Sequence, residues 1–139
     1  MMRNVAVLAA ALAAAIPMPA GAGTTAAPAG TAVTLPAPLP PREAGARYGQ
    51  ALGVALICYG LRTTSALDRL PSQYAGDART EFDSESEKTV AAWRETGSCK
   101  KAGGPNACRL VHEWSCHAAL NEIGPDGSVL PGLVEQKAP

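Results

Sequence analysis

Four cysteines and two histidines are the residues of this 139-residue chain whose types and spacing could support metal, haem or redox chemistry. Cys108, His112 and Cys116 recur every four residues, and His117 adds a second imidazole. Thiolate and imidazole groups are preferred zinc and copper ligands, so this row suggests a metal site that uses His112, Cys116 and His117. On one helix, however, the two cysteines are about 12 Å apart, which prevents both sulfurs from binding one ion.

Covalent haem is a second cofactor hypothesis, because Cys116-His117 ends like a haem-attachment sequence. Such a sequence needs an earlier cysteine at the position where this chain has Glu113. Metal or haem binding through the last helix therefore remains an alternative, and the main prediction is a chain with no cofactor.

An even number of cysteines, on a chain that begins with an export-like segment, predicts two disulfides. A bridge between Cys108 and Cys116 is excluded, because a disulfide needs a Cα separation of roughly 4.4–6.8 Å. We predict the pairs Cys99–Cys108 and Cys58–Cys116. The flexible segment after Cys99 joins one helix end to the next helix start, and an up-down-up bundle places Cys58 nearer Cys116 than Cys108.

The other polar clusters have simpler interpretations. Lys100 and Lys101 beside Cys99 could favour a reactive thiolate, but the chain has no Cys-x-x-Cys pair, and an exposed, solubilising loop is the simpler explanation. The acidic residues from Asp77 to Glu87 spread over several helix faces, which indicates a solvated helix terminus and not acid–base or calcium chemistry. Neither histidine has a serine or aspartate partner at a supporting spacing, so we predict a protein that is not an enzyme.

The N-terminus predicts export. Arg3 precedes the apolar run Val5–Ile16, Pro17 ends this run, and Ala20-Gly21-Ala22 offers small residues for cleavage. Residues 1–22 are therefore interpreted as a signal peptide, which implies a periplasmic or secreted protein. The apolar run is shorter than the roughly 20 residues of a membrane span, so we expect no transmembrane segment after signal removal.

Composition divides the rest of the chain. Residues 23–41 contain five prolines and no charged residue, which predicts a disordered linker. Residues 42–134 are expected to form a helical, disulfide-bonded domain, and residues 135–139 a tail. Basic and acidic residues both number 12, so the formal net charge is zero. This balance, without a basic run, argues against nucleic-acid binding and electrostatic membrane anchoring.

The hydrophobic pattern of the domain predicts an all-α bundle of three to four helices. The predicted helices cover Arg42–Arg62, a short segment from Thr64 to Pro71, Asp77–Thr96 with a stop at Gly97, and Asn106–Ile123. An extended segment, residues 129–134, is expected to pack on the bundle.

The predicted faces of these helices come from residue spacing. Gly45, Gly49 and Gly53 recur every four residues, which predicts a close helix–helix contact inside the core. The inner face of the first helix is expected to hold Tyr48, Leu52, Ala55, Leu56 and Tyr59. The third predicted helix is expected to turn Phe82, Thr89, Val90 and Trp93 inward.

The last predicted helix has two apolar arcs, which suggests that it is the central one. One arc holds Ala107, Leu110, Val111, Trp114 and Ala118. The other holds Cys108, His112, Cys116, Ala119 and Ile123.

The order of parts between Cys58 and Cys108 resembles that of small periplasmic lysozyme inhibitors. The matching parts are Leu67-Asp68-Arg69-Leu70, Ala92-Trp93-Arg94 and a glycine-rich loop between two cysteines. The overall prediction is a small exported, non-catalytic protein that binds or inhibits a protein partner in the bacterial cell envelope. A metal- or haem-binding bundle is the alternative.

Overall fold

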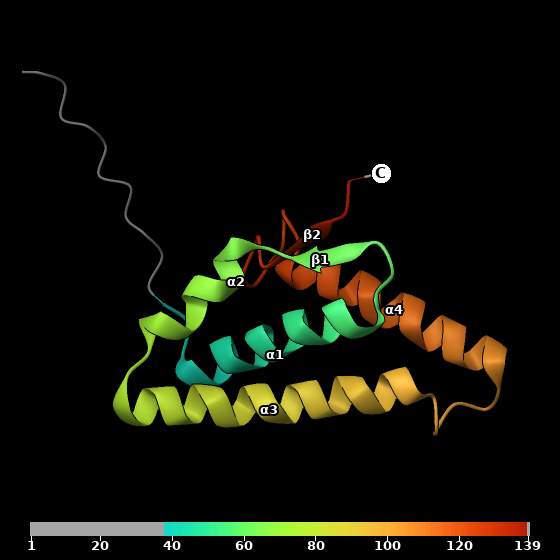
Figure 1. The fold of residues 1–139 in the computed structure, drawn as a ribbon, viewed down its shortest axis with the longest axis horizontal. Coiled ribbons are helices and arrows are strands. Elements are labelled where there is room, and N and C mark those ends of the chain that lie inside the picture. Colours follow the sequence, from blue (N-terminus) through green and yellow to red (C-terminus); the bar gives the residue numbers. More distant parts are fainter. Residues whose placement is uncertain (1–37, 139) are drawn as a thin grey trace, which may run out of the picture. The chain divides into compact units, whose positions relative to one another are not determined.

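The computed structural model describes residues 38–138, which are mostly helical, as predicted. The predicted signal peptide and most of the predicted linker lie outside these residues. The elements are α1 (Pro41–Ile57), β1 (Leu61–Thr63), α2 (Ser65–Arg69), the 3₁₀ turn η1 (Leu70–Gln73), α3 (Gly76–Ser98), α4 (Pro105–Ile123) and β2 (Val134–Gln136) (Figure 1).

The domain boundaries extend slightly beyond the predicted ones. The hydroxyl of Tyr74 donates to the carbonyl of Leu39 at 2.8 Å, and α1 begins at Pro41, so the end of the predicted linker is part of the fold. Proline suits the first turn of a helix because its missing N–H would have no partner there. Glu135 and Gln136, predicted as tail, belong to β2.

The glycines of α1 contact α3 directly, as their spacing predicted. A Cβ added at Gly49 would lie 2.5 Å from the carbonyl oxygen of Ser86, so this position has no room for a side chain. Gly45 faces Phe82 and Gly53 faces Trp93 in the same way. The residue numbers of the contacting positions increase together along the two helices, so α1 and α3 run in the same direction (Figure 1).

The predicted up-down-up path is therefore wrong. β1, α2 and η1 return the chain to the start of α1, so that α3 runs parallel to α1 and α4 runs back (Figure 1). The predicted first helix was also too long, because it ends at Ile57 and residues 61–63 form β1. Gly60, at φ +85°, makes the turn that separates them.

The predicted inner face of α1 was only partly right. Tyr48 and Leu52 pack against the core, but Ala55, Leu56 and Tyr59 are exposed. The glycine side of the helix faces α3 instead, because only the smallest residues allow so close an approach. Seven residues of α1 are buried, which makes α1 the central helix: Ala44, Gly45, Gly49, Gln50, Ala51, Gly53 and Val54.

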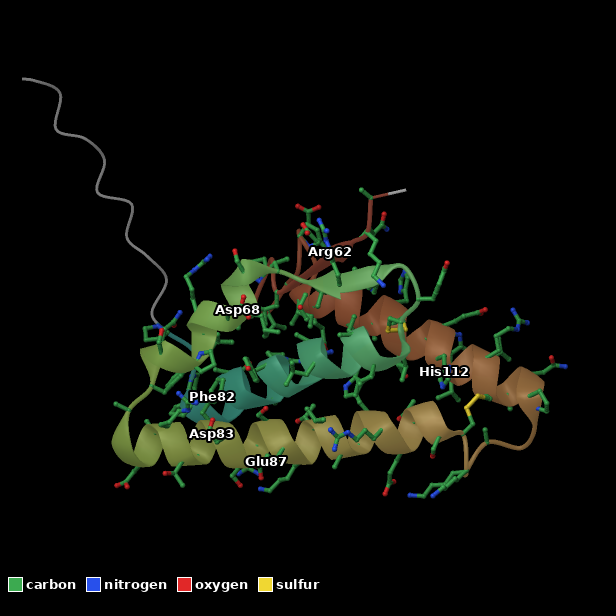
Figure 2. The ribbon with its side chains drawn as sticks, in the orientation of Figure 1. Arg62, Asp68, Phe82, Asp83, Glu87 and His112 are labelled. Carbon is green, nitrogen blue, oxygen red and sulfur yellow. A yellow bond between two sulfur atoms is a disulfide. The ribbon has the colours of Figure 1, made fainter. Side chains whose placement is uncertain are left out.

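Phe82 is the largest fully buried side chain of the described residues, and it lies near the start of α3, against α1 (Figure 2). Its ring lies 5.1 Å from that of Tyr74, stacked, and 5.3 Å from that of Tyr48, tilted. Such pairs add stability beyond their buried area. The guanidinium of Arg79 lies over the same ring at 5.9 Å and forms an ion pair with Asp83.

α3 continues past its predicted stop at Gly97. Gly97 faces Ile57 of α1, where a Cβ would lie 2.6 Å from a methyl carbon, so this glycine serves close packing. The helix ends instead at Cys99, whose left-handed backbone (φ 55°) terminates it.

The C-terminal segment completes the core, as expected for residues 129–134. β2 pairs antiparallel with β1, with Thr63 opposite Val134. Leu133 and Val134 are buried. The hydroxyl of Thr64 caps α2 by accepting from the amide of Ala66, and its backbone N–H donates to the Leu133 carbonyl at 3.0 Å.

Among the described residues, no helix combines the length and the apolar character that crossing a membrane requires.

Candidate functional site

Both predicted disulfides are present, and they hold α4 at two points. Cys58, at the end of α1, is bonded to Cys116 in the middle of α4, with a Cα separation of 5.7 Å. Cys99, at the end of α3, is bonded to Cys108 in the first turns of α4, with a Cα separation of 5.4 Å. All four cysteines are thus paired, which is typical of an oxidising, extracytoplasmic compartment.

α4 is a peripheral helix, contrary to the prediction that it is central. Only Ala119 and Ile123, near its C-terminal end, are buried. Its N-terminal half lies beyond the end of α1 (Figure 1). This position explains how Cys58 reaches Cys116 although the helices do not follow the expected path.

The two apolar arcs of α4 have different surroundings. The arc with both cysteines, His112, Ala119 and Ile123 faces the rest of the domain, because both disulfides and both buried residues lie on it. The opposite arc faces solvent, and we call it the outer face of α4. It comprises Ala107, Leu110, Val111, Trp114 and Ala118.

The outer face of α4 is exposed where its side chains are largest. Trp114 is 72% exposed, Leu110 42% and Val111 41%. Side chains three or four positions apart on a helix are neighbours, so these three form one continuous apolar surface. An exposed tryptophan keeps a large apolar side chain in contact with water. Contiguous exposed apolar patches of this kind are typical of interaction sites.

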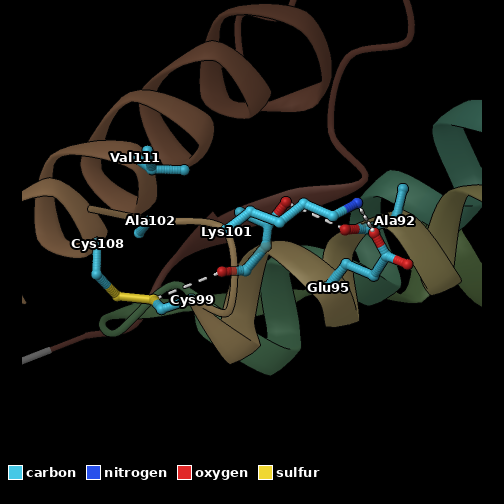
Figure 3. Close-up of a pocket in the computed structure, with 8 residues that line it drawn as sticks. Ala92, Glu95, Cys99, Lys101, Ala102, Cys108 and Val111 are labelled. Atoms are coloured by element: carbon cyan, nitrogen blue, oxygen red, sulfur yellow. Dashed lines mark hydrogen bonds and ion pairs between the residues drawn. A yellow bond between two sulfur atoms is a disulfide. The ribbon is translucent and has the colours of Figure 1, made fainter. Parts of the chain in front are cut away.

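Two hollows flank the N-terminal half of α4. One, of about 370 Å³, lies between the end of α3, the following loop and α4, and includes Val111 among its lining residues (Figure 3). The other, of about 410 Å³, lies on the α1 side and is lined by residues such as Ile57, Tyr59 and Arg109. Tyr59 is fully exposed at its edge.

Charge is divided between the two ends of the domain. Residues 94–117, which include the loop and most of α4, contain four basic residues and two acidic ones. Residues 76–88, the first half of α3, contain five acidic residues and two basic ones. Figure 2 shows Asp83 and Glu87 on α3, away from His112 on α4. Lys101 and Arg109 are paired with Glu95 and Glu113, so the basic border of the outer face of α4 has its excess charge on Arg94 and Lys100.

The acidic residues of α3 do not converge on a site. Asp83 pairs with Arg79, and Glu85 lies within 3.4–3.5 Å of Lys88 and Arg42. These are the contacts of a solvated helix surface, as the sequence predicted.

His112 lies beside the Cys99–Cys108 disulfide. Its Nε2 atom is 3.3 Å from the sulfur of Cys99 and 3.8 Å from that of Cys108. The same nitrogen is 3.1 Å from the carbonyl oxygen of Thr96. A carbonyl oxygen can only accept, so this contact assigns the proton to Nε2.

The predicted alternative metal set is not brought together. Cys116 is bonded to Cys58, and His117 is exposed and has its Nδ1 atom 3.3 Å from the amide nitrogen of Asn121. The histidine that does meet sulfur is His112, whose nitrogen and the sulfurs of Cys99 and Cys108 all lie within 4.8 Å of one another. While these sulfurs are bonded to each other, the cluster offers no thiolate to a metal ion.

Lys101, predicted as part of a solubilising loop, forms an ion pair with Glu95 at 2.9 Å (Figure 3). The hydrogen bond from Lys101, and then its charge, lower the pKa of Glu95, and the same pair raises the pKa of Lys101. Both side chains are exposed, so the pair borders the hollow without closing it.

The exposure of the outer face of α4 was missed by sequence reasoning, although a signal for it was present. Cys108 and Cys116 share one arc, and both were predicted to bond to other elements. That arc must therefore face the domain, which leaves Leu110 and Trp114 outside.

No protein-family model, curated protein or solved structure matches this chain.

Proposed function

We propose that this chain is an exported, non-catalytic protein that binds or inhibits a partner protein in the bacterial cell envelope through the outer face of α4. The observation that carries the proposal is the continuous exposure of Leu110, Val111 and Trp114 on one helix face. Tryptophan is the residue type most often found as an energetic centre of protein interfaces. Two disulfides tie this helix to α1 and α3, so the surface is rigid before binding.

The partner is a protein that presents an apolar surface bordered by carboxylates. This chemistry complements the apolar outer face and its basic border, where Lys100 and Arg109 are exposed. Arg109 is partly balanced by Glu113 and Lys101 by Glu95, each at 2.9 Å, which leaves Lys100 as the main attraction. Complementary charges at a rim mainly accelerate association, so binding slows as salt concentration rises.

The decisive experiment compares capture from envelope extract by three baits. These are the mature wild-type domain, the variant Leu110→Ser/Trp114→Ser, and the control Leu56→Ser, which removes an exposed leucine from α1 instead. We expect the double variant to lose the captured protein and the control to keep it. Loss of an interface centre typically weakens binding by about 2 kcal/mol or more, which is at least roughly 30-fold.

Equal capture by all three baits would contradict the proposal. Dimerisation of the purified wild type through Trp114, measured by analytical ultracentrifugation, would also contradict it, because the occupant would then be a second copy. Far-ultraviolet circular dichroism verifies that the variants are folded.

Export is supported by the N-terminal signal pattern and by the two disulfides. The mature chain is expected to begin near Gly23, after Ala20-Gly21-Ala22. Intact-mass measurement of the exported protein gives the cleavage site. A membrane-retained protein that keeps residues 1–16 would contradict this part of the proposal.

Metal binding is the second candidate, and the cluster of Cys99, Cys108 and His112 favours it over haem. It requires both sulfurs as thiolates, hence reduction of their bond. Metal analysis and an absorption spectrum of the purified mature protein separate it from the first candidate.

A further inference from the structure

The two disulfides differ in their surroundings. Cys58 is buried, so its bond to Cys116 is shielded at that end by the core. Cys99 and Cys108 are both partly exposed, and both border the hollow of about 370 Å³ (Figure 3). Cys108 and Cys116 both line the second hollow, of about 410 Å³, so the Cys58–Cys116 bridge is open to solvent at one end and the Cys99–Cys108 bridge at both. A thiol from solution can therefore approach the Cys99–Cys108 bond without unfolding the domain.

His112 is placed to stabilise one product of thiol exchange. Its Nε2 atom, whose proton the Thr96 carbonyl accepts at 3.1 Å, lies 3.3 Å from the sulfur of Cys99, so this one proton is shared between the carbonyl and the sulfur. A sulfur in a disulfide is a weak acceptor, whereas a thiolate accepts strongly. Lys101, at the border of the same hollow, is paired with Glu95, so the stabilisation of a thiolate depends on His112. The arrangement therefore favours a thiolate on Cys99 over the bonded form.

We propose that Cys99–Cys108 is a thiol–disulfide exchange site whose substrate is a dithiol, and that His112 stabilises the thiolate released on Cys99. The site adjoins the outer face of α4, because Val111 lines the hollow, and it adds a stoichiometric redox role to the binding role proposed above. Cys58–Cys116 is the structural bridge and does not exchange.

The exchange proceeds in two balanced steps. A thiolate of the dithiol attacks the sulfur of Cys108, a bond forms between these two sulfurs, and the electron pair of the broken bond leaves on Cys99. The second thiol of the dithiol then loses its proton and attacks its own partner sulfur, which expels Cys108 as a thiolate. The dithiol is oxidised to a disulfide by two electrons, and the cysteine pair is reduced by the same two.

The direction of attack follows from the distances. The sulfur of Cys99 is closer to Nε2 of His112 than the sulfur of Cys108, 3.3 Å against 3.8 Å, so Cys99 is the better leaving group. Cys108 lines both hollows, whereas Cys99 lines only the first. Stabilisation of the leaving group and access for the attacking thiolate therefore both favour attack on Cys108 with departure of Cys99.

The first test uses the wild-type protein. The folded, oxidised domain is treated with dithiothreitol, samples are alkylated over time, and the modified cysteines are mapped by mass spectrometry. We expect Cys99 and Cys108 to be alkylated while Cys58 and Cys116 remain bonded. Equal reduction of both bridges, or earlier reduction of Cys58–Cys116, would overturn the proposal.

Glutathione, a monothiol, tests the direction of attack. The mixed disulfide is expected on Cys108, with Cys99 open to alkylation. A mixed disulfide found mainly on Cys99 would refute the role of His112 in selecting the leaving group.

The role of His112 is tested by equilibrating variants with glutathione redox buffers. His112→Ala should shift the equilibrium toward the disulfide by about tenfold, the effect of losing one hydrogen bond to a charged group. His117→Ala is the matched control and should have no effect. His112→Gln keeps an N–H donor, so its redox equilibrium should lie between those of the wild type and His112→Ala. A folded His112→Ala with the wild-type equilibrium would overturn this assignment.

Discussion

Arg47 in α1 donates from Nη1 to Oε2 of Glu122 in α4 at 2.5 Å, although 75 positions separate the two residues. Gln50 donates to the same carboxylate oxygen at 2.7 Å. The two charged side chains are only 24% and 36% exposed. This contact joins the C-terminal half of α4 to the central helix, where the disulfides do not reach.

Replacing Glu122 by Gln should destabilise the fold by about 1–3 kcal/mol, because Arg47 would keep its charge in a half-buried place without a carboxylate. Urea unfolding measures the loss. Glu135→Gln is the control, since Glu135 pairs with Arg62 at the surface and such pairs contribute about 0–1 kcal/mol. Equal losses in the two variants would show that burial of the Arg47 pair has no energetic effect.

Gly49→Ala should destabilise the contact between α1 and α3, because the new Cβ would lie 2.5 Å from the Ser86 carbonyl oxygen. Overpacking of this kind costs about 1–3 kcal/mol. Thermal unfolding provides the measurement. Gly103→Ala, where a Cβ meets nothing within 4 Å, should leave the melting temperature nearly unchanged. An unaffected Gly49→Ala would mean that the helices can separate at no cost.

Removing the Cys58–Cys116 bridge should cost more than removing Cys99–Cys108. Their sequence separations are 58 and 9 residues, and loop-closure entropy gives about 4 and about 2.7 kcal/mol. Double alanine variants of each pair, unfolded by urea, test the order. Cys58→Ala alone should cost about 2–5 kcal/mol and leave Cys116 open to alkylation. The reverse order of stabilities would contradict the entropic estimate.

Lys101→Met should raise the pKa of Glu95, which Lys101 lowers in the wild type. A carboxylate with a lowered folded pKa favours the folded state at higher pH, and this contribution disappears as pH falls through that pKa. The pair is fully exposed, so the direct readout is an NMR titration of the Glu95 carboxyl group and not stability. Lys100→Met is the control and should shift this pKa less, because Lys100 has the smaller effect. An unchanged titration in Lys101→Met would refute the pairing.

Local patterns predicted much of the fold. Helix geometry excludes a bridge between Cys108 and Cys116, and the short loop after Cys99 favours Cys99–Cys108, but the up-down-up path that also supported this pairing is wrong. The contact of α1 with α3 followed from Gly45, Gly49 and Gly53, since a glycine row allows close approach whichever helix provides the partner. Thr64 was correctly placed at the start of the second helix, where its hydroxyl caps α2, and α1 begins at Pro41, one residue before the predicted Arg42.

Long-range choices could not be predicted from local patterns. Leu56 and Tyr59 continue an apolar spacing, but the glycine side of α1 faces α3 and leaves them exposed. The direction of α3 depends on the return of the chain through β1, α2 and η1, and β1 pairs with β2 through residues such as Thr63 and Val134, 71 positions apart, for which short strands give no periodic signal. The exposure of Trp114 depends in turn on where α4 lies. The contact of His112 with Cys99 could not be predicted either, because it depends on the left-handed turn at Cys99 that leads the chain toward α4.

The pairing of β2 with β1 has a consequence for the timing of folding. Leu133 and Val134 fill the core, and the amide of Lys137 donates to the Gly60 carbonyl at 2.7 Å. During synthesis, α1, α3 and α4 emerge before the segment that covers them. A chain that ends before Leu133 therefore lacks part of the core, and we expect it to expose Leu61 and Leu67 and to be recognised by chaperones and proteases.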